Sequence, residues 1–307
     1  MMRPRVGVVG AGRVGSVLAA RLRHVGLDVV AVSARSDASR LRAATALPGV
    51  PVLEPTEVAR AGDLLVLSVP DDELVRVVEE LVAVGAITTG QVVVHTSGRH
   101  GLGALEAAAR VGARVVALHP AMTFTGAPSD RLADDARLDC VFGVTAGPDE
   151  VALADELVGL LGGTVLHVAE QDRATYHAAL AHGANHLVTL VAQSASLLRS
   201  IDATGGAVDP AAVLRPLLEA ALDNALRLGD AALTGPVARG DVTTVRAHTD
   251  ALAAAPADTR ESYLALARAT ARRVEADGRV DHDTSRQVQQ VLREAEWDAL
   301  AESAARV

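Results

Sequence analysis

The sequence predicts an α/β fold in which a doubly wound domain over residues 1–170 is followed by an all-helical domain over residues 171–307. Three observations support this prediction. Short apolar runs alternate with amphipathic stretches through the first half of the chain, as in parallel βαβ units. A glycine-rich turn joins the first run to the first amphipathic stretch. From Asp172 onward the apolar spacing is helical, with no strand pattern.

The glycine-rich turn is Gly10-Ala11-Gly12-Arg13-Val14-Gly15, between an expected strand over 5–9 and an expected helix over 16–24. A turn of this kind is typical of a dinucleotide site. Gly10 would make the tight turn, Gly12 would let the backbone approach a pyrophosphate, and Gly15 would let helix and strand pack closely. The alternative is a purely structural turn.

The remaining elements follow from apolar spacing, capping residues and chain breakers. In the first domain we expect strands over 28–33, 63–69, 91–94, 114–118, 139–144 and 164–168, and helices over 39–46, 56–61, 73–84, 103–109 and 150–161. In the second domain we expect a central buried helix over 172–201, then helices over 210–228, 236–239, 242–253, 259–276 and 283–305, with Pro216 kinking or breaking the second.

The end of the second strand favours NADP over NAD. NAD sites usually carry an acid there for the ribose hydroxyls, whereas this chain has Ser33-Ala34-Arg35-Ser36. Arg35 can bind a 2′-phosphate, and Ser33 or Ser36 can donate to it. The alternative is that Arg35 is an ordinary solvated residue. We expect the cofactor to contact the following residues: Gly10, Gly12, Arg13, Val14, Gly15, Ser33, Arg35, Ser36, Val69 and Pro70.

Polar residues of reactive type follow two later strands. Ser97 and Gly98 come after the strand over 91–94, and His119 comes after the strand over 114–118. Ligands of doubly wound sheets bind at such strand ends. Ser97 and Gly98 could therefore meet a substrate, and His119 could exchange a proton near pH 7. Alternatively, Ser97 caps the next helix and His119 is a turn residue.

The first stretch of the helical domain carries polar groups on an otherwise apolar segment. These include His177, His182, Asn185 and His186. Histidines four apart can share a metal on a helix face, but no acidic ligand accompanies them, so we expect no metal. Buried polar groups need partners, which are either a substrate or other helices. Farther along, Arg239 either binds an anionic substrate group or pairs with Asp241.

Composition excludes several classes of protein. Aromatic residues make up 2% of the chain and the formal net charge is −9, so we expect no nucleic-acid or anionic-membrane partner. No apolar stretch approaches the roughly 18 residues of a membrane span, and the first residues lack a secretory signal pattern. We expect a cytoplasmic protein. The chain has no lysine, which excludes Schiff-base chemistry, and its single cysteine, Cys140, is expected to be a buried inert thiol.

Five segments resemble those of a known family: GAGRVG at 10–15, HTSG at 95–98, HPAMTF at 119–124, YHAALAHGANHLVTL at 176–190 and LTGPVARGD at 233–241. The family is described as a Rossmann-like domain followed by a domain of unknown function, DUF2520. It is similar to the β-hydroxyacid dehydrogenase group, which includes 6-phosphogluconate dehydrogenase, ketopantoate reductase and pyrroline-5-carboxylate reductase. The resemblance runs from residue 5 to about residue 260.

This resemblance implies an NADP-binding Rossmann domain, a helical domain of the 6-phosphogluconate dehydrogenase C-terminal type, an active site in the cleft between them and a homodimer formed through the helical domain. Several members of the wider group use a lysine followed by an asparagine on the first long helix. Asn185 matches the asparagine, but the lysine is absent and His177 is the available proton donor. Prephenate dehydrogenases, a neighbouring family, place a serine and a His-Pro at these strand ends, which supports Ser97 and His119 as substrate-facing.

We therefore expect an NADP(H)-dependent oxidoreductase of a small carboxylate-bearing oxo or hydroxy acid, with ketopantoate as the first substrate to test. His177 or His119 would donate the proton, Asn185 and Ser97 would orient the carbonyl, with Gly98 beside it, and Arg239 would neutralise the carboxylate. Two alternatives stay open. One is a prephenate dehydrogenase-like oxidation. The other is an NADP-binding sensor or regulatory module without turnover, which would explain the missing lysine.

Overall fold

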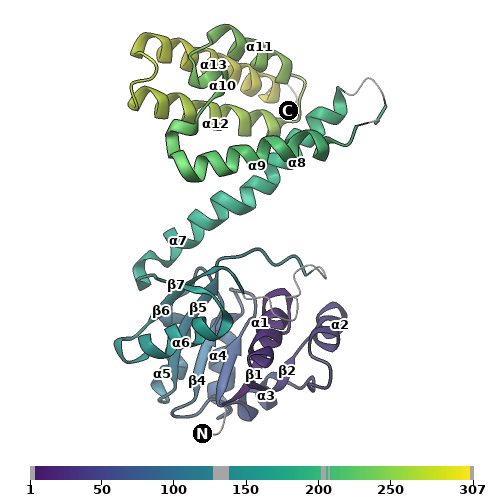
Figure 1. The fold of residues 1–307 in the computed structure, drawn as a ribbon, viewed down its shortest axis with the longest axis vertical. Helices are drawn as coiled ribbons and strands as arrows, with labels where there is room; N and C mark the ends of the chain where they lie inside the picture. Colours follow the sequence, from purple (N-terminus) through teal and green to yellow (C-terminus); the bar gives the residue numbers. More distant parts are fainter. Residues whose placement is uncertain (1–3, 127–137, 202–204, 207, 305–307) are drawn as a thin grey trace. The chain divides into compact units, whose positions relative to one another are not determined.

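The computed structural model describes residues 4–126, 138–201, 205–206 and 208–304. The chain divides into two compact units, Met1–Ala184 and Asn185–Val307. Within the described residues, the first unit holds every strand, and the second unit is built from helices (Figure 1). The expected order of an α/β domain followed by a helical domain is confirmed.

Seven strands form one sheet in the order β2-β1-β3-β4-β5-β6-β7. Neighbouring strands from β2 to β5 are parallel, so their carboxyl ends lie along one edge of the sheet. That edge is where ligands of doubly wound sheets bind. The strands are β1 (Arg5–Val9), β2 (Asp28–Ser33), β3 (Leu64–Leu67), β4 (Val92–His95), β5 (Arg114–Pro120), β6 (Val141–Ala146) and β7 (Thr164–His167).

One strand departs from the expected all-parallel arrangement. β6 is antiparallel to β5, with His119 opposite Gly143, whereas β7 is parallel to β6. A parallel neighbour requires a crossover of a dozen or more residues, usually a helix, and α6 (Val151–Leu161) provides one between β6 and β7. Sequence spacing does not report strand direction, so the prediction was wrong at this one pairing.

Helices cover both faces of the sheet. The first face carries α1 (Arg13–His24), α2 (Asp37–Ala46) and α6 over a core that includes Leu18, Val66 and Leu157. The second face carries α3 (Pro55–Ala61), α4 (Leu74–Ala83), the 3₁₀ helix η1 (Leu102–Leu105) and α5 (Glu106–Arg110) over a core that includes Leu65 and Leu74. Because both faces are covered, the strands are nearly continuous apolar runs.

The first unit ends on α7 (Arg173–Leu180), which follows the 3₁₀ helix η4 (Glu170–Asp172). A π-helical turn over Ala181–Asn185 comes next, and the division between the two compact units falls inside it. The change to helical spacing at residue 172 therefore precedes this division by about three turns of helix. The reason is that Arg173 and Tyr176 of α7 contact the sheet.

The second unit has its core among α11, α12 and α13, where Val245, Leu264 and Leu292 are buried. Pro216 neither breaks nor ends α9, which runs through it, so the expected break is absent. The helices of this unit are α8 (His186–Ser200), α9 (Pro210–Leu228), α10 (Gly235–Ala238), α11 (Val242–Leu252), α12 (Ala257–Ala276) and α13 (His282–Ala304).

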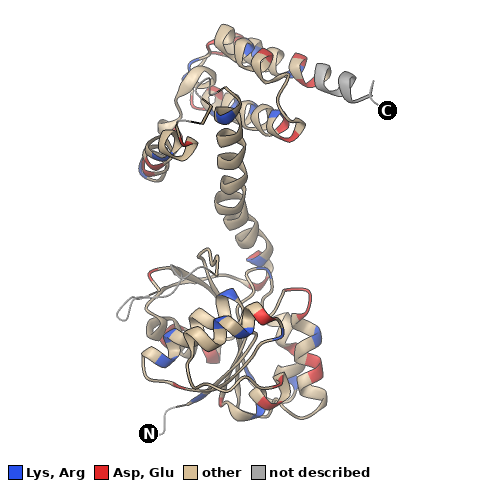
Figure 2. Cartoon of the chain, turned by 90° about the vertical axis from the view of Figure 1, so that its right-hand side faces the viewer, with Lys and Arg blue, Asp and Glu red and all other residues tan. Residues whose placement is uncertain are grey.

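The expected burial of the stretch over 172–201 was wrong for the single chain. Only Gln193 is buried in α8, and α9 buries no residue. Figure 2 shows this stretch as almost uncharged. Its charged residues are Asp172, Arg173 and Arg199. Among the described residues, no helix combines the length and the apolar character that crossing a bilayer requires.

Candidate active site

The glycine-rich turn has the three geometries that its spacing predicts. Gly10 adopts φ +99°, and a Cβ there would overlap the carbonyl oxygen of Ser68. A Cβ on Gly15 would overlap the carbonyl oxygen of Gly10, so α1 lies directly against β1. In contrast, a Cβ on Gly12 would meet no atom of the described residues within 4 Å. The backbone at Gly12 is therefore open to a ligand, while Gly10 and Gly15 hold the turn in shape.

The turn presents the N-terminus of α1 to this open space. Gly12 is the N-cap, without a side-chain capping bond, and the first turn of α1 carries no acidic residue. A helix N-terminus of this kind is suited to a phosphate, because its N–H groups and dipole favour negative charge. Arg13 is exposed, and Val14 packs against the core beside the turn.

Both serines near the end of β2 have local structural roles. The Ser33 hydroxyl accepts from the Gly10 amide at 3.0 Å, and its carbonyl accepts from the Ala11 amide at 2.7 Å. Ser36 caps α2, where its hydroxyl accepts from the amide of Ser39 at 3.2 Å. Ser33 thus shapes the glycine turn, a role that the sequence did not suggest.

Arg35 is the exposed cation at this edge. Its side chain is 72% exposed, and its nearest acid is Glu73, with 3.9 Å between Nη1 and Oε2. Glu73 is also bonded to Arg76, so it has a second cationic partner. After β3, Val69 is half-buried and Pro70 is exposed. The Pro70 carbonyl accepts from the amide of Glu73 at 3.0 Å, which fixes the loop next to Arg35.

Farther along the same edge, five residues come together in what we call the histidine cluster: Ser97, Gly98, His119, Tyr176 and His177. Gly98 lies at its centre, because a Cβ there would be 2.6 Å from Cδ2 of His177 and 3.0 Å from Nε2 of His119. The structure thus brings together four residues predicted from three separate segments, since Ser97 and Gly98 follow β4, His119 is in β5 and His177 is in α7.

Tyr176 completes the histidine cluster. Its hydroxyl lies 3.0 Å from Nδ1 of His119, and the two rings meet edge to face with centroids 5.7 Å apart. The ring of His177 also meets that of His119 edge to face, at 6.0 Å. Burial raises the pKa of Tyr176, so the phenol keeps its proton at neutral pH and can donate it in a hydrogen bond.

His119 is neutral at physiological pH. Burial, and next the positive charge of Arg173, lower its pKa to about 4. We expected His119 to exchange a proton near pH 7. A neutral imidazole instead donates a hydrogen bond from one ring nitrogen and accepts one at the other. In the tautomer in which Tyr176 donates to Nδ1, the ring carries its hydrogen on Nε2, which is the nitrogen beside Gly98.

Ser97 is held by its backbone and its side chain. Its hydroxyl accepts from the His100 amide at 3.1 Å, and its amide donates to Nδ1 of His95 at 3.2 Å. His95 is fully buried, and its Nε2 lies 2.9 Å from the Gly101 carbonyl. Burial lowers the pKa of His95 to about 4. Ser97 does not cap the next helix, because the N-cap of η1 is Gly101 and the amide of His100 lies in the loop before it. The Ser97 hydroxyl also has a hydrogen that it can donate to a ligand.

Arg173 is a residue that sequence reasoning missed. Its side chain is 1% exposed, and its guanidinium donates to the carbonyls of Ser97 at 2.6 Å, His100 at 2.8 Å and Gly143 at 3.0 Å. It also lies over the ring of Tyr176, 5.6 Å from the centroid. Arginine is almost never fully buried unless paired, so position in the sequence gave no signal for this contact.

Glu170 is a second missed residue. Its carboxylate accepts from the amides of Leu102 at 2.7 Å and Gly103 at 3.1 Å. These amides begin η1, so the carboxylate satisfies N–H groups that the helix leaves unbonded. Glu170 therefore ties the segment before α7 to the segment after β4, beside the histidine cluster.

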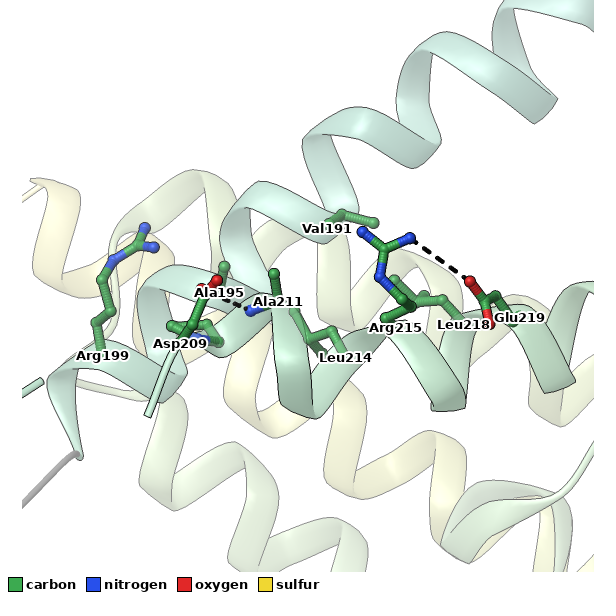
Figure 3. A pocket seen from close by; sticks show the side chains of 10 residues that line it. Val191, Ala195, Arg199, Asp209, Ala211, Leu214, Arg215, Leu218 and Glu219 are labelled. Atoms are coloured by element: carbon green, nitrogen blue, oxygen red, sulfur yellow. Dashed lines mark hydrogen bonds and ion pairs between the residues drawn. The ribbon is translucent and has the colours of Figure 1, made fainter. Parts of the chain in front are cut away.

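Two predicted site residues, Asn185 and Arg239, belong to the second unit. Both are exposed. Asp241 caps α11, with its carboxylate accepting from the Thr244 amide at 3.0 Å. His182 and His186 form no group with a third metal-ligating side chain among the described residues. A groove of about 310 Å³ lies between α8 and α9, with Arg215 bonded to Glu219 at its rim (Figure 3).

Two family models match the chain. One, a Rossmann-like domain, matches residues 1–120, and the other, a domain of unknown function named DUF2520, matches residues 140–270. The chain therefore combines a Rossmann-like domain with a DUF2520 domain, as in the family that its five segments resemble. The histidine cluster draws its residues from both matched regions, because His119 lies in the first and Tyr176 in the second.

Solved structures share the fold of this Rossmann-like and DUF2520 protein. A Bacteroides fragilis protein proposed to be an NADP oxidoreductase has a TM-score of 0.72 at 22% identity, over 87% of this chain and 98% of the other. An imine reductase from Pseudomonas sp. has a TM-score of 0.61 at 21% identity, over 96% of this chain and 100% of the other. Pyrroline carboxylate reductase from Plasmodium falciparum, with NADP bound, has a TM-score of 0.56 at 13% identity, over 95% of this chain and 99% of the other. No curated protein matches the sequence.

Proposed function

We propose that the protein is an NADP(H)-dependent oxidoreductase that acts on a small carboxylate-bearing oxo or hydroxy acid. The observation that carries this proposal is that an open phosphate-binding turn and a cluster of proton-bearing side chains occupy the same edge of one sheet, within one compact unit. The solved structures of similar fold include reductases described with NADP or NADPH, which supports the same reaction class.

The residues of the first unit fit NADP. The open backbone at Gly12 and the N-terminus of α1 would hold the pyrophosphate. Arg35, exposed at the end of β2 where NAD sites usually carry an acid, would hold the 2′-phosphate. Val69 and Pro70 would line the adenosine side. NADPH supplies a hydride to the acceptor carbon when it is bound.

The histidine cluster would supply the polar chemistry of the reaction. We assign to His119 the hydrogen bond from Nε2 to the substrate oxygen, with the Tyr176 hydroxyl bonded to Nδ1 as its support. His177, on the other side of Gly98, is the second proton donor. Ser97 would orient the same oxygen through its hydroxyl hydrogen. We assign Asn185 to orienting the carbonyl and Arg239 to the substrate carboxylate, as the sequence predicts.

The first test follows NADPH oxidation by the purified protein with ketopantoate. We expect turnover in the ordinary enzyme range of about 1 to 10³ per second, and we expect loss of turnover when His119 and His177 are both changed to alanine. NADPH affinity should stay within about twofold of wild type in that variant, because the glycine turn is untouched. Undiminished turnover in the double variant would contradict the assignment.

A second candidate substrate is a cyclic imine. The similar folds of a pyrroline carboxylate reductase and an imine reductase favour it, and the neutral His119 suits either a carbonyl or an imine because it donates without needing to be an imidazolium. The same assay, with a pyrroline carboxylate in place of ketopantoate, separates the two. Tight NADPH binding without turnover of oxo acids or imines would favour the sensor instead.

We also propose that the protein is a homodimer formed through the helical unit. The support is the exposed apolar surface of α8 and α9, where Val188 is 68% exposed, Leu217 64% and Leu226 80%. Exposed patches of this kind mark interaction sites in soluble proteins. Light scattering should give twice the chain mass, and Leu226→Glu together with Leu217→Glu should give the mass of one chain.

A further inference from the structure

The strongest unassigned feature of the molecule is the buried guanidinium of Arg173. It bonds the carbonyls of Ser97 and His100, which follow β4, and the carbonyl of Gly143 in β6. β5 lies between β4 and β6 in the sheet, so these bonds span the strand that carries His119. Of the carboxylates that the structure describes, none forms an ion pair with Arg173.

Three residues of α7 act together. Arg173, Tyr176 and His177 are related by spacings of three and four, which place side chains on one face of a helix. The guanidinium lies 5.6 Å from the Tyr176 ring centroid. Fixing Arg173 to backbone carbonyls therefore fixes the side chains that flank His119, because all three belong to the same two turns of helix.

We propose that Arg173 is a positioning residue of the candidate active site: it holds α7 so that the Tyr176 hydroxyl meets Nδ1 of His119, and it places a positive charge, which no described carboxylate pairs directly, beside the ring. This proposal rests on the proposed function. The contacts favour a positioning role over a simple packing role, since a buried arginine bonded only to neutral carbonyls keeps its full charge in a medium of low dielectric constant.

The charged and titratable groups around His119 agree with this assignment. Arg173 and His177 on α7 and His95 on β4 lower the pKa of His119, whereas Asp71 in the loop after β3 raises it. Arg173 has the largest effect after burial itself. A positive charge at this place would also stabilise the negative charge that develops on a carbonyl oxygen during reduction.

The test compares Arg173→Met, which removes the charge and the donors, with Arg173→Lys, which keeps the charge but loses the three-way bonding. Arg110→Met is the matched control, because Arg110 is an exposed arginine on α5 bonded to Glu106. Four quantities are measured on the full chain. They are the pKa of His119, from NMR of its ring protons, and the kcat, KM and NADPH affinity with the substrate that the wild type turns over.

In Arg173→Met we expect the pKa of His119 to rise from about 4 toward its ordinary value of about 6.5. We also expect kcat to fall about 10²-fold, as when a reacting group is displaced by about 1 Å, with NADPH affinity within about twofold of wild type. In Arg173→Lys we expect the pKa of His119 to stay low and kcat to fall about tenfold. Tyr176→Phe should reproduce the fall in kcat with a smaller rise in the pKa of His119, because it removes the hydrogen bond to Nδ1 but leaves the charge of Arg173 in place.

An unchanged pKa of His119 in folded Arg173→Met would overturn the proposal. If that variant does not fold, wild-type turnover in Arg173→Lys would overturn it instead. A wild type that turns over nothing would count against the proposed function alone, because the NMR titration of His119 and its contact with Tyr176 would still decide the role of Arg173.

Discussion

The glycine turn and the histidine cluster lie along one edge of the same sheet, yet they are built in opposite ways. At the turn, no described residue fills the space next to Gly12, and the two arginines of this region, Arg13 and Arg35, are exposed. In the cluster, side chains fill the space around Gly98, and Arg173 is almost completely buried. The difference teaches that the first region is shaped to admit a ligand and the second to hold its own groups in fixed orientation.

The sharpest way to break this comparison is to remove the imidazole of His119. We expect His119→Ala to lower kcat by about 10²- to 10³-fold, the usual contribution of one hydrogen-bond donor to a developing oxyanion, and to leave NADPH affinity unchanged. His167→Ala is the control, because His167 in β7 is exposed and paired with Asp155. Steady-state kinetics with NADPH would check both, and equal losses in the two variants would contradict the separation of the regions.

Two alanine substitutions distinguish a glycine that is needed for ligand binding from a glycine that is needed for packing. Gly12→Ala adds a methyl group where no atom of the described residues lies within 4 Å, so we expect an unchanged melting temperature and an NADPH Kd raised about 10²-fold. Gly15→Ala meets the Gly10 carbonyl, so we expect a lower melting temperature as well. Calorimetry and fluorescence titration would measure these effects. A destabilised Gly12→Ala would show that the open space is not the reason for glycine there.

Acid should weaken the neighbourhood of the histidine cluster. His95 is fully buried and its pKa is lowered to about 4, against about 6.5 in the unfolded chain. Its contribution to the free energy of unfolding is therefore complete above pH 6.5 and is lost as the pH falls from 6.5 toward 4. At pH 5 the loss is about 2 kcal/mol by proton linkage. Urea unfolding at pH 7 and pH 5, for wild type and His95→Asn, would measure it.

In the His95 experiment, the variant should lose less stability than wild type between the two pH values, since it lacks the titrating group. Equal losses would mean that other groups dominate the acid sensitivity. The glycine turn carries no buried titratable side chain of its own, so the loss belongs to the region around β4.

The smallest expected effect concerns Arg35. We expect Arg35→Ala to raise the Kd for NADPH about tenfold, the equivalent of about 1.4 kcal/mol, because an exposed arginine–phosphate pair is partly screened by solvent. The Kd for NADH should stay within about twofold. Arg110→Ala is the control, because Arg110 is an exposed arginine on α5 that pairs with Glu106. Equal weakening of NADPH and NADH would assign Arg35 to a role other than the 2′-phosphate.

Much of the fold could be predicted because it depends on local patterns. Apolar runs located the strands, and the spacing of the glycines predicted the tight turn at Gly10 and the close packing at Gly15, which the structure has. The approach of a pyrophosphate to Gly12 stays a prediction. The antiparallel pairing of β6 could not be predicted, since strand direction depends on partners far apart in sequence. The exposure of α8 and α9 was also missed. The sequence of an apolar helix is the same whether the helix is buried by its own chain or by another chain.

The candidate site was predictable only where its residues follow a strand. Ser97, Gly98 and His119 stand at strand ends, and the α/β rule places such residues at one edge. Tyr176 was noticeable as a polar group on an apolar helix, but its contact with Nδ1 of His119 depends on tertiary structure. Arg173 was invisible, because a single arginine at a helix start is usually solvated.

The bonds of Arg173 go to main-chain oxygens, and this has a consequence for how the protein can change over time. Residues 97, 100 and 143 each offer a carbonyl whatever side chain they carry. Substitutions that alter the side chain at residue 97 or 100 can therefore reshape the surface offered to a substrate without releasing α7 from the sheet. Relatives with the same scaffold are free to diverge in the molecules they accept, because the support of the site is independent of the side chains that select them.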